Sequence, residues 1–263
     1  MLKTLGRLVL ASTCVMSATL PAHAHFQLAY TPEVNVSRAG DQPVKLIFWH
    51  PFENGHVMDM AEPLDFYAVN RGKKIDLKST LSPITFTGSA NSAAAFDGVL
   101  TLRRSGDYVM VVVPAPYYEE SEDIFIQQLT KSYVSRNEIP TDWMEPQGLK
   151  TEILPLNRPT NIIAGSTFTG RVLSDGKPLA GVEVEVEYMA AEPDMASNTP
   201  QEPTASPMPG VPWSHFPMKT GISHSAFQKR AFGGSQHLAA ALTKNFRVKS
   251  FHRMQSCGFA PMM

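Results

Sequence analysis

The sequence predicts an all-β protein with two β-sandwich-like domains, of which the second is incomplete. Runs of β-branched and aromatic residues, each bounded by Gly, Pro, Asn or Asp, recur from residue 26 onward and are typical of short strands. The 21 prolines outnumber the 17 glycines, which favours strands and loops over long helices. A chain of 263 residues with 43% hydrophobic and 18% charged side chains has an ordinary globular composition and enough length for two small cores.

The first 24 residues have the features of a secretory signal peptide. Two basic residues precede an apolar run at 8–20, and the segment ends in a small-x-small pattern at Ala24. The apolar run is shorter than the ~20 residues that a membrane span needs. We therefore expect an exported, periplasmic protein whose mature chain begins at His25.

The first predicted domain, residues 25–150, contains clear strand candidates. The candidate strands are 44–49, 64–69, 98–104 and 108–116. The Ser-Gly-Asp turn at 105–107 favours a hairpin between the last two of these. Residues 124–134 fit either a helix or a strand, because periodicity alone does not separate the two.

The second predicted domain covers residues 151–212. A Pro-rich, polar connection at 135–160 leads into it and overlaps its first ten residues. That connection ends in EILPLNRP, and two strands are predicted after it, TFTGRVL and VEVEVEY. Gly176 and Gly181 supply the permissive backbone of the turn between these strands. The Val/Glu alternation of the second strand indicates one apolar face and one acidic face, and the acidic face fits a solvated sheet surface better than a metal site. A Pro/Ser/Thr-rich loop follows.

A group of possible metal ligands lies close to the predicted mature N-terminus. The segment HPFENGHVMDM, directly after a predicted strand, contains His50, Glu53, His56 and Met58. If cleavage follows Ala24, His25 offers both its α-amine and its ring Nδ1 as a chelate. Imidazole and carboxylate suit nickel, cobalt, zinc or copper(II), whereas thioethers favour copper(I).

Explanations of these residues that involve no metal site stay open. Some residue must follow any cleavage site, His50 could cap its strand, and Met58 could belong to the core. Against this, the body of the chain between leader and tail contains three histidines, and all of them fall within 32 positions. We therefore predict a metal site of His25, His50, Glu53, His56 and Met58.

The order of these segments resembles a known family over about residues 25–212. A mature start HFQ is followed by WHPFENGHVMDMAEP, EILPLNRP and AGSTFTGRVLSDGKPLAGVEVEVEY. This order resembles the uncharacterised-domain proteins described as periplasmic components of cobalt/nickel ABC-type (energy-coupling-factor) uptake systems. The resemblance implies a nickel- or cobalt-binding protein that serves an inner-membrane nickel/cobalt permease complex. The second domain is similar to the transthyretin-like or carboxypeptidase-regulatory β-sandwich, in which DGKPLAGVEVEV forms the early hairpin.

The charge distribution fits a cation-binding body. Of the 23 basic residues, two lie in the leader and seven in residues 213–263, while all 24 acidic residues lie in between. The body therefore carries a net charge of −10, which suits attraction of cations and argues against nucleic acid as a partner. We find no Ser-His-Asp or Cys-His arrangement and no Gly-rich phosphate loop, so we expect no enzyme. The alternatives are an N-terminal-His copper protein or oxidase, and a structural or adhesion β-sandwich without metal.

The tail at 213–263 does not continue the pattern of the second domain. It has no acidic residue and no alternating strand, although a sandwich of this type needs further strands. Our hypothesis is that the tail is translated out of frame and largely disordered. With permitted codons, the shifted frame of residues 213–234 reads VTFPDENGDFTFGIPKAGFWW, which supplies the missing turns and alternating strand. The alternative is a basic tail that binds an anionic surface.

The nucleotide sequence of the gene tests this hypothesis. We expect the shifted frame to encode that string and to continue the second domain. A gene whose shifted frame encodes neither the turns nor the alternating strand contradicts the hypothesis.

Overall fold

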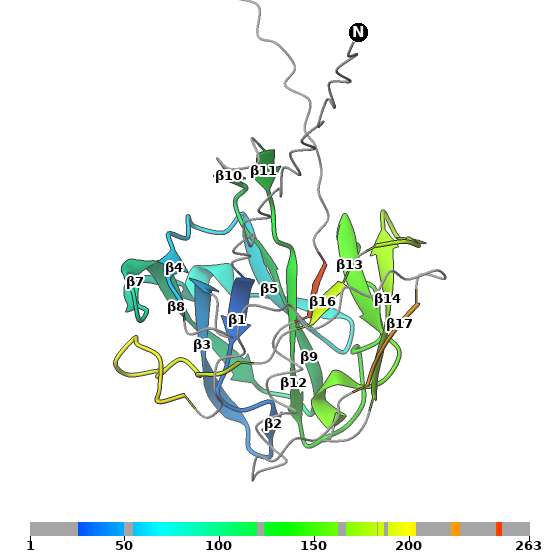
Figure 1. Ribbon diagram of the computed structural model, residues 1–263. Helices are drawn as coiled ribbons and strands as arrows, with labels where there is room; N and C mark the ends of the chain where they lie inside the picture. The colour runs from blue at the N-terminus through cyan, green and yellow to red at the C-terminus, as the bar shows by residue number, and fades with distance from the viewer. Residues whose placement is uncertain are drawn as a thin grey trace, which may run out of the picture.

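The computed structural model describes residues 26–49, 55–119, 124–162, 167–182, 184–186, 189–203, 222–226 and 246–248 (Figure 1). The described residues form strands and two short 3-10 helices, η1 (Lys78–Thr80) and η2 (Pro159–Asn161). This confirms the predicted all-β, sandwich-like class. In the part of the chain that is described, no helix is long and apolar enough to cross a membrane.

Two sheets face each other in the first sandwich. The first sheet has the order β1-β3-β8-β7, with β4 paired to the end of β3, and every pairing is antiparallel. Its strands are β1 (Phe26–Tyr30), β3 (Gly40–Trp49), β4 (Val57–Met58), β7 (Ser82–Thr87) and β8 (Ser92–Leu102). The second sheet has the order β2-β12-β9-β5-β6. Its strands are β2 (Asn35–Val36), β5 (Asp65–Asn70), β6 (Lys73–Asp76), β9 (Gly106–Val113) and β12 (Thr130–Arg136).

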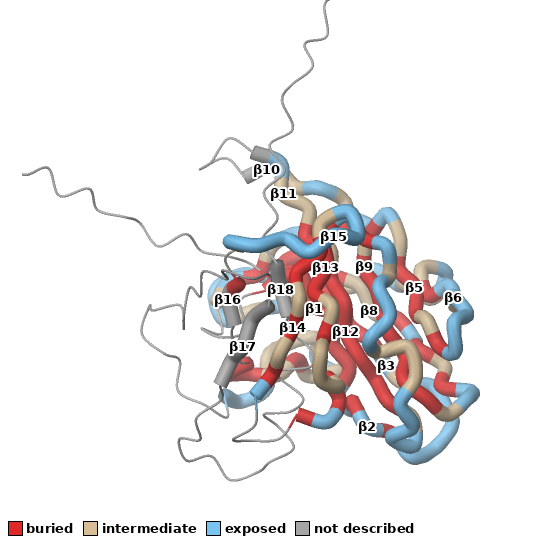
Figure 2. Tube along the Cα trace, turned by 90° about the vertical axis from the view of Figure 1, so that its right-hand side faces the viewer, coloured by how far each residue is buried: buried red, intermediate tan, exposed pale blue. Residues whose placement is uncertain are grey.

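Alternating side chains fill the space between these sheets. From β3, Val44, Leu46 and Phe48 point into the core, where they join Tyr108 and Met110 of β9. The opposite face of β9 is also buried, because the second sheet is covered on its outer side by residues near Trp143 and Leu149. Burial on both faces explains why β9 is apolar at nearly every position instead of alternating. Figure 2 shows the buried residues concentrated along the central strands.

The predicted hairpin at residues 105–107 is wrong. β8 pairs with β3 and β7, whereas β9 pairs with β5 and β12, so the turn carries the chain from one sheet to the other. Gly106 has φ +127°, and a Cβ there would lie 2.8 Å from Thr141 Oγ1. The turn signal was therefore real, but a turn does not determine whether its flanking strands pair with each other.

The segment at 124–134, which the sequence left undecided, is extended. It forms β11 (Ile124–Ile126), paired with β10 (Tyr117–Glu119), and then the first part of β12. The pair β10–β11 projects from the end of the sandwich in Figure 1.

A third sheet follows the first sandwich. It contains β13 (Thr151–Pro155), β14 (Thr167–Ser174), β15 (Lys177–Pro178) and β17 (Ile222–Ala226), and β14 pairs with each of the others. A separate pair joins β16 (Val184–Val186) to β18 (Phe246–Val248). The predicted turn after β14 is confirmed: Asp175 and Gly176 have φ values of 48° and 72°, as a two-residue type I′ hairpin turn requires.

Residues 189–203, which we call the strap, return to the outer face of the first sheet. Met189 and Ala191 pack there with a cluster that includes Trp49 and Phe86. Tyr30 Oη donates a 2.6 Å hydrogen bond to Glu192 Oε2 of the strap.

Asn198 anchors the far part of the strap. Its side-chain oxygen accepts a hydrogen bond from Lys45 Nζ, which also forms a 2.5 Å ion pair with Asp97. Its backbone oxygen accepts a hydrogen bond from the Thr87 backbone N–H at 2.9 Å. These contacts explain how Lys45, in the middle of an apolar strand, is fully buried.

We predict that the protein loses stability in alkali through its buried tyrosines. Burial raises the pKa of Tyr30, with a further contribution from the hydrogen bond to Glu192, and burial also raises the pKa of Tyr67 and Tyr133. An unfolded tyrosine ionises near pH ~10, so the stability from these raised values is complete below that pH and is lost as the pH rises above it. Urea unfolding between pH 8 and 11 should show this decline.

Tyr30→Phe should lower the free energy of unfolding at pH 8 by about 1.5–3 kcal/mol, because it removes a hydrogen bond to a carboxylate. It should also reduce the alkaline slope. Tyr118→Phe, at an exposed tyrosine, is the matched control. Equal slopes in all three proteins contradict the prediction.

Candidate metal centre

Two of the predicted ligands lie in the described part of the chain. His56 is exposed and immediately precedes β4, and Met58 lies on β4, partly buried against the sandwich core. His25, His50 and Glu53 lie outside the described residues. The structure therefore does not show whether these five side chains come together.

The strands β1, β3 and β4 meet at one end of the first sheet. Phe26 of β1 pairs with Trp49 of β3, and Trp49 pairs on its other side with Val57 of β4. These three residues form one row across three adjacent strands, and their side chains belong to the outer cluster beneath the strap. The first residue of β1, the last residue of β3 and the first residue of β4 are therefore direct neighbours.

Specific hydrogen bonds return the chain to this row after residue 54. Trp49 Nε1 donates to the Gly55 carbonyl oxygen at 3.2 Å. The Asn91 side chain accepts from the Val57 backbone N–H and donates to the Val57 carbonyl, both at 2.8 Å. Gly88 lies close to the same segment, and a Cβ there would lie 3.0 Å from the Gly55 oxygen. These contacts hold the backbone on both sides of His56, at Gly55 and Val57.

A second row lies one residue further into the sheet and faces the core. It consists of Gln27, Phe48 and Met58, which are Cα partners across β1, β3 and β4. The Phe48 ring contacts Tyr117 from the other side of the sandwich, edge to face, at a centroid distance of 5.6 Å. This end of the first sheet thus has amide, thioether and phenol groups on its inner side.

Gln27 is tied to the opposite wall of the sandwich. Its backbone N–H donates to Gln128 Oε1 at 3.0 Å, and Gln128 Nε2 donates to Tyr117 Oη at 3.2 Å. Its side-chain Nε2 donates to the Leu28 carbonyl at 3.1 Å and contacts Met60 Sδ at 3.5 Å. Gln27 stands in the HFQ segment, but nothing in that sequence predicts these contacts.

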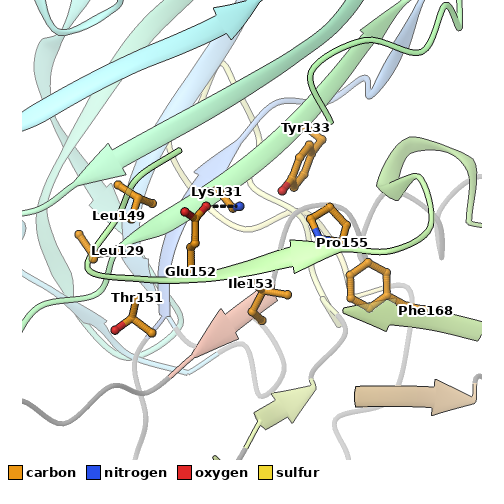
Figure 3. A pocket seen from close by; sticks show the side chains of 9 residues that line it. All are labelled: Leu129, Lys131, Tyr133, Leu149, Thr151, Glu152, Ile153, Pro155 and Phe168. Atoms are coloured by element: carbon orange, nitrogen blue, oxygen red, sulfur yellow. Dashed lines mark hydrogen bonds and ion pairs between the residues drawn. The ribbon is translucent and has the colours of Figure 1, made fainter. Parts of the chain in front are cut away.

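Among the described residues, no three His, Cys, Asp or Glu side chains cluster as metal ligands would. A second kind of site, a cavity, lies between the first sandwich and the third sheet (Figure 3). Its volume is about 20 Å³, enough for one water molecule. The residues that line it are Leu129, Lys131, Tyr133, Leu149, Thr151, Glu152, Ile153, Pro155 and Phe168.

The charged groups of this cavity pair with each other. Lys131 Nζ and Glu152 Oε2 are 2.7 Å apart, and both side chains are buried. Glu152 also accepts hydrogen bonds from the backbone N–H groups of Gln147 and Gly148 at 3.0–3.1 Å. Burial raises the pKa of Tyr133, so this phenol stays protonated at neutral pH. The cavity is therefore a structural joint between β12 and β13.

Arg158 makes a second joint between the same parts of the molecule. Its Nη2 lies 2.6 Å from Asp107 Oδ1 of β9 and 2.6 Å from Ser135 Oγ of β12, and its Nη1 donates to the Glu138 carbonyl at 2.7 Å. Glu152 and Arg158 are the two charged residues of EILPLNRP, a segment that sequence analysis treated as a connection. The sequence signal for these two ion pairs is the presence of two opposite charges in a short, otherwise mostly apolar segment that contains proline.

We predict that removing one partner of the Lys131–Glu152 pair is strongly destabilising. Lys131→Met leaves a buried carboxylate without its cation and should lower the free energy of unfolding by about 3–5 kcal/mol. The double variant Lys131→Met/Glu152→Gln removes both charges but keeps an oxygen for the Gln147 and Gly148 N–H groups, so it should recover most of the loss. Urea denaturation measures both. A double variant no more stable than Lys131→Met contradicts the prediction.

Comparison with known proteins gives a family for this chain. Residues 22–207 match the family described as Domain of unknown function (DUF4198), which is well over half of the chain. The matched range includes the first sandwich, β13–β16 and the strap, and it ends before the tail at 213–263. No curated protein and no solved structure matches. The chain belongs to the DUF4198 family of domains of unknown function.

Proposed function

We propose that the mature protein binds a divalent transition-metal ion at the end of the first sheet where β1, β3 and β4 meet. The three histidines His25, His50 and His56 supply the main ligands, with Glu53 and Met58 beside them. One observation carries this proposal: the pairing register of β1, β3 and β4.

Phe26 pairs with Trp49, and Trp49 pairs with Val57. We propose that this register continues by one residue, which would make His25, His50 and His56 the next Cα partners. Partners in an antiparallel ladder have Cα atoms about 4.5–5.5 Å apart, and side chains of one row lie on the same face. A row of three imidazoles on one face suits a metal ion with nitrogen ligands. The continuation is the step that the proposal adds.

The chemistry of the predicted N-terminus strengthens this site. Cleavage after Ala24 gives His25 a free α-amine, which forms a chelate with its own imidazole. The net charge of −10 on the body favours the approach of cations. Imidazole and amine ligands with a carboxylate suit nickel or cobalt, which the resemblance to cobalt/nickel uptake components also favours; copper and zinc are the competing ions.

The same resemblance supports the wider role. We propose a periplasmic protein, not an enzyme, that captures nickel or cobalt and serves an inner-membrane permease complex. The signal-like leader supports the location, and the acidic body supports a metal ion, not nucleic acid, as the ligand.

A second candidate is a copper protein or oxidase with an N-terminal histidine. It is favoured by Tyr117, an aromatic hydroxyl that packs on Phe48, two residues along the chain from the proposed ligand His50. An oxidase of this type needs such a group near the open coordination positions of its copper.

Calorimetric titration of the mature protein with nickel(II), cobalt(II), copper(II) and zinc(II) tests the proposal. We expect binding well below millimolar concentration. His50→Ala and His56→Ala should each weaken nickel binding at least about tenfold, because each removes one ligand bond worth at least ~1.4 kcal/mol. One extra residue before His25 should also weaken it, because the α-amine then no longer chelates.

His252→Ala, in the tail that we exclude from the site, is the matched control and should bind like the parent. Unchanged affinity in both histidine variants and in the extended protein contradicts the proposal. Tight copper binding together with peroxide-dependent turnover favours the oxidase instead.

A further inference from the structure

Four arginines gather around one turn of the first sandwich, the turn that carries the chain from β8 to β9. Arg71 Nε donates to the Ser105 carbonyl at 2.9 Å. Arg136 Nη1 donates to Ser105 Oγ at 3.4 Å and to the Arg103 carbonyl at 3.3 Å. Arg103 and Arg104 immediately precede Ser105 in the chain. We call Arg71, Arg103, Arg104 and Arg136 the arginine end.

The positive charge of the arginine end is not neutralised by ion pairs. Among the described residues, none of its four guanidinium groups forms an ion pair with a carboxylate. Asp107, beneath the turn, already pairs with Arg158 at 2.6 Å. The Asp142 carboxylate accepts hydrogen bonds from the backbone N–H groups of Arg71 and Gly72, at 2.5 and 2.6 Å. A body with a net charge of −10 thus has a basic surface at this place.

Two apolar side chains are exposed beside the arginines. The segment 137–144 is tied to the arginine end at two points, by the Asn137 side chain on Ser105 Oγ at 2.8 Å and by the carboxylate of Asp142. Ile139, between these two points, is 42% exposed, and Met144, just after them, is 48% exposed. Arginine and large apolar side chains therefore lie on the same end of the sandwich.

The arginine end lies away from the end where β1, β3 and β4 meet. Gly40, the first residue of β3, pairs with Leu102, next to Arg103, whereas Trp49 ends β3 at the far side of the sheet. Val36 of β2 pairs with Arg136. Figure 1 shows β2 at the opposite end of the sandwich from the β10–β11 pair.

We propose that the arginine end docks the protein on an anionic phospholipid membrane surface. A guanidinium group is a planar fork that matches the geometry of phosphate oxygens, so the four arginines suit phosphodiester headgroups. Ile139 and Met144 suit the boundary between headgroups and acyl chains, where apolar side chains leave water. An acidic protein partner would pair with the arginines but would offer no such apolar layer beside its charges.

The charge of the remaining body determines how the protein docks. An anionic surface repels the acidic body and attracts the arginine end, so one orientation is favoured. In this orientation the end where β1, β3 and β4 meet points away from the membrane. The inference goes beyond the proposed function and does not rest on the metal site.

Co-sedimentation of the mature protein with lipid vesicles tests this docking. We expect binding to vesicles of equal parts phosphatidylglycerol and phosphatidylcholine, no binding to phosphatidylcholine alone, and weaker binding as salt screens the charges. Arg103→Gln/Arg104→Gln should weaken binding about 30-fold, which is about fivefold for each charge removed. Ile139→Ser/Met144→Ser should weaken it about tenfold, because two apolar side chains no longer leave water.

Lys150→Gln/Lys177→Gln is the matched control. Both lysines are exposed and lie beside the hairpin turn between β14 and β15, in the third sheet. This variant loses the same charge as Arg103→Gln/Arg104→Gln and should bind vesicles like the parent or better by less than twofold. Since Arg103 and Arg104 are exposed and their side chains make no hydrogen bond among the described residues, all these variants should melt like the parent.

The basic tail at 213–263 is the competing source of membrane binding, and Lys229→Gln/Arg230→Gln measures its share. Vesicle binding that is lost in this tail variant but unchanged in Arg103→Gln/Arg104→Gln overturns the proposal. A parent that does not bind the phosphatidylglycerol vesicles at low salt overturns it as well, and so does a control variant that loses as much affinity as Arg103→Gln/Arg104→Gln. Nickel affinity should be equal in the parent and all these variants, so the metal proposal stands or fails separately.

Discussion

The buried ion pair between Lys131 and Glu152 is the interaction on which the arrangement of the molecule depends. It joins β12, in the first sandwich, to β13, the first strand of the third sheet, at a distance of 2.7 Å. Burying both charges is costly, and the geometry repays that cost only because Glu152 accepts further backbone hydrogen bonds. Arg158 forms a second ion pair, with Asp107 of the sandwich. The segment EILPLNRP therefore attaches the third sheet to the sandwich through one acidic and one basic side chain. The cavity between the sandwich and the third sheet lies around the Lys131–Glu152 pair.

This attachment lets the rest of the chain close the first sandwich. With the third sheet held in place, the strap reaches back over the first sheet, where Glu192 meets Tyr30 and Asn198 meets Lys45. The outer face of the second sheet is covered by the segment around Trp143 and Leu149. Both sheets are thus covered on their outer faces, and the end where β1, β3 and β4 meet is the place that the proposed metal site occupies. Phe26, Trp49 and Val57, which lie beneath the strap, support this end of the sheet on its outer face. Gln27 and Tyr117 support it on its inner face.

Much of the fold could be predicted because strand signals are local. Alternating or apolar β-branched runs correctly predicted β3, β5, β8, β9 and β14, and the turn at Asp175-Gly176 was also predicted. The strand that pairs back on β14 is β15, however, whereas β16 of the predicted VEVEVEY strand pairs with β18. The pairing of β8 and β9 was predicted wrongly, since a turn signal does not say which sheet the next strand joins. The candidate ligands were found as residue types crowded near one end of the chain, and their assembly stays a prediction. The buried contacts of Gln27 could not be predicted, because a glutamine in a strand has no chemical signature until its burial is known.

The sequence by itself determined the family, the strand-rich class and the crowding of imidazoles near the predicted mature N-terminus, because composition, period and residue type are properties of neighbours along the chain. Only the tertiary structure decided that Phe26, Trp49 and Val57 share one row, although 31 positions separate the first from the last. Likewise it alone showed that the buried Glu152 pairs with Lys131 and that the partly buried Arg158 pairs with the buried Asp107. The physical reason is common to both cases: strand register and burial result from the packing of distant segments, and no local pattern encodes which distant segment will be the partner.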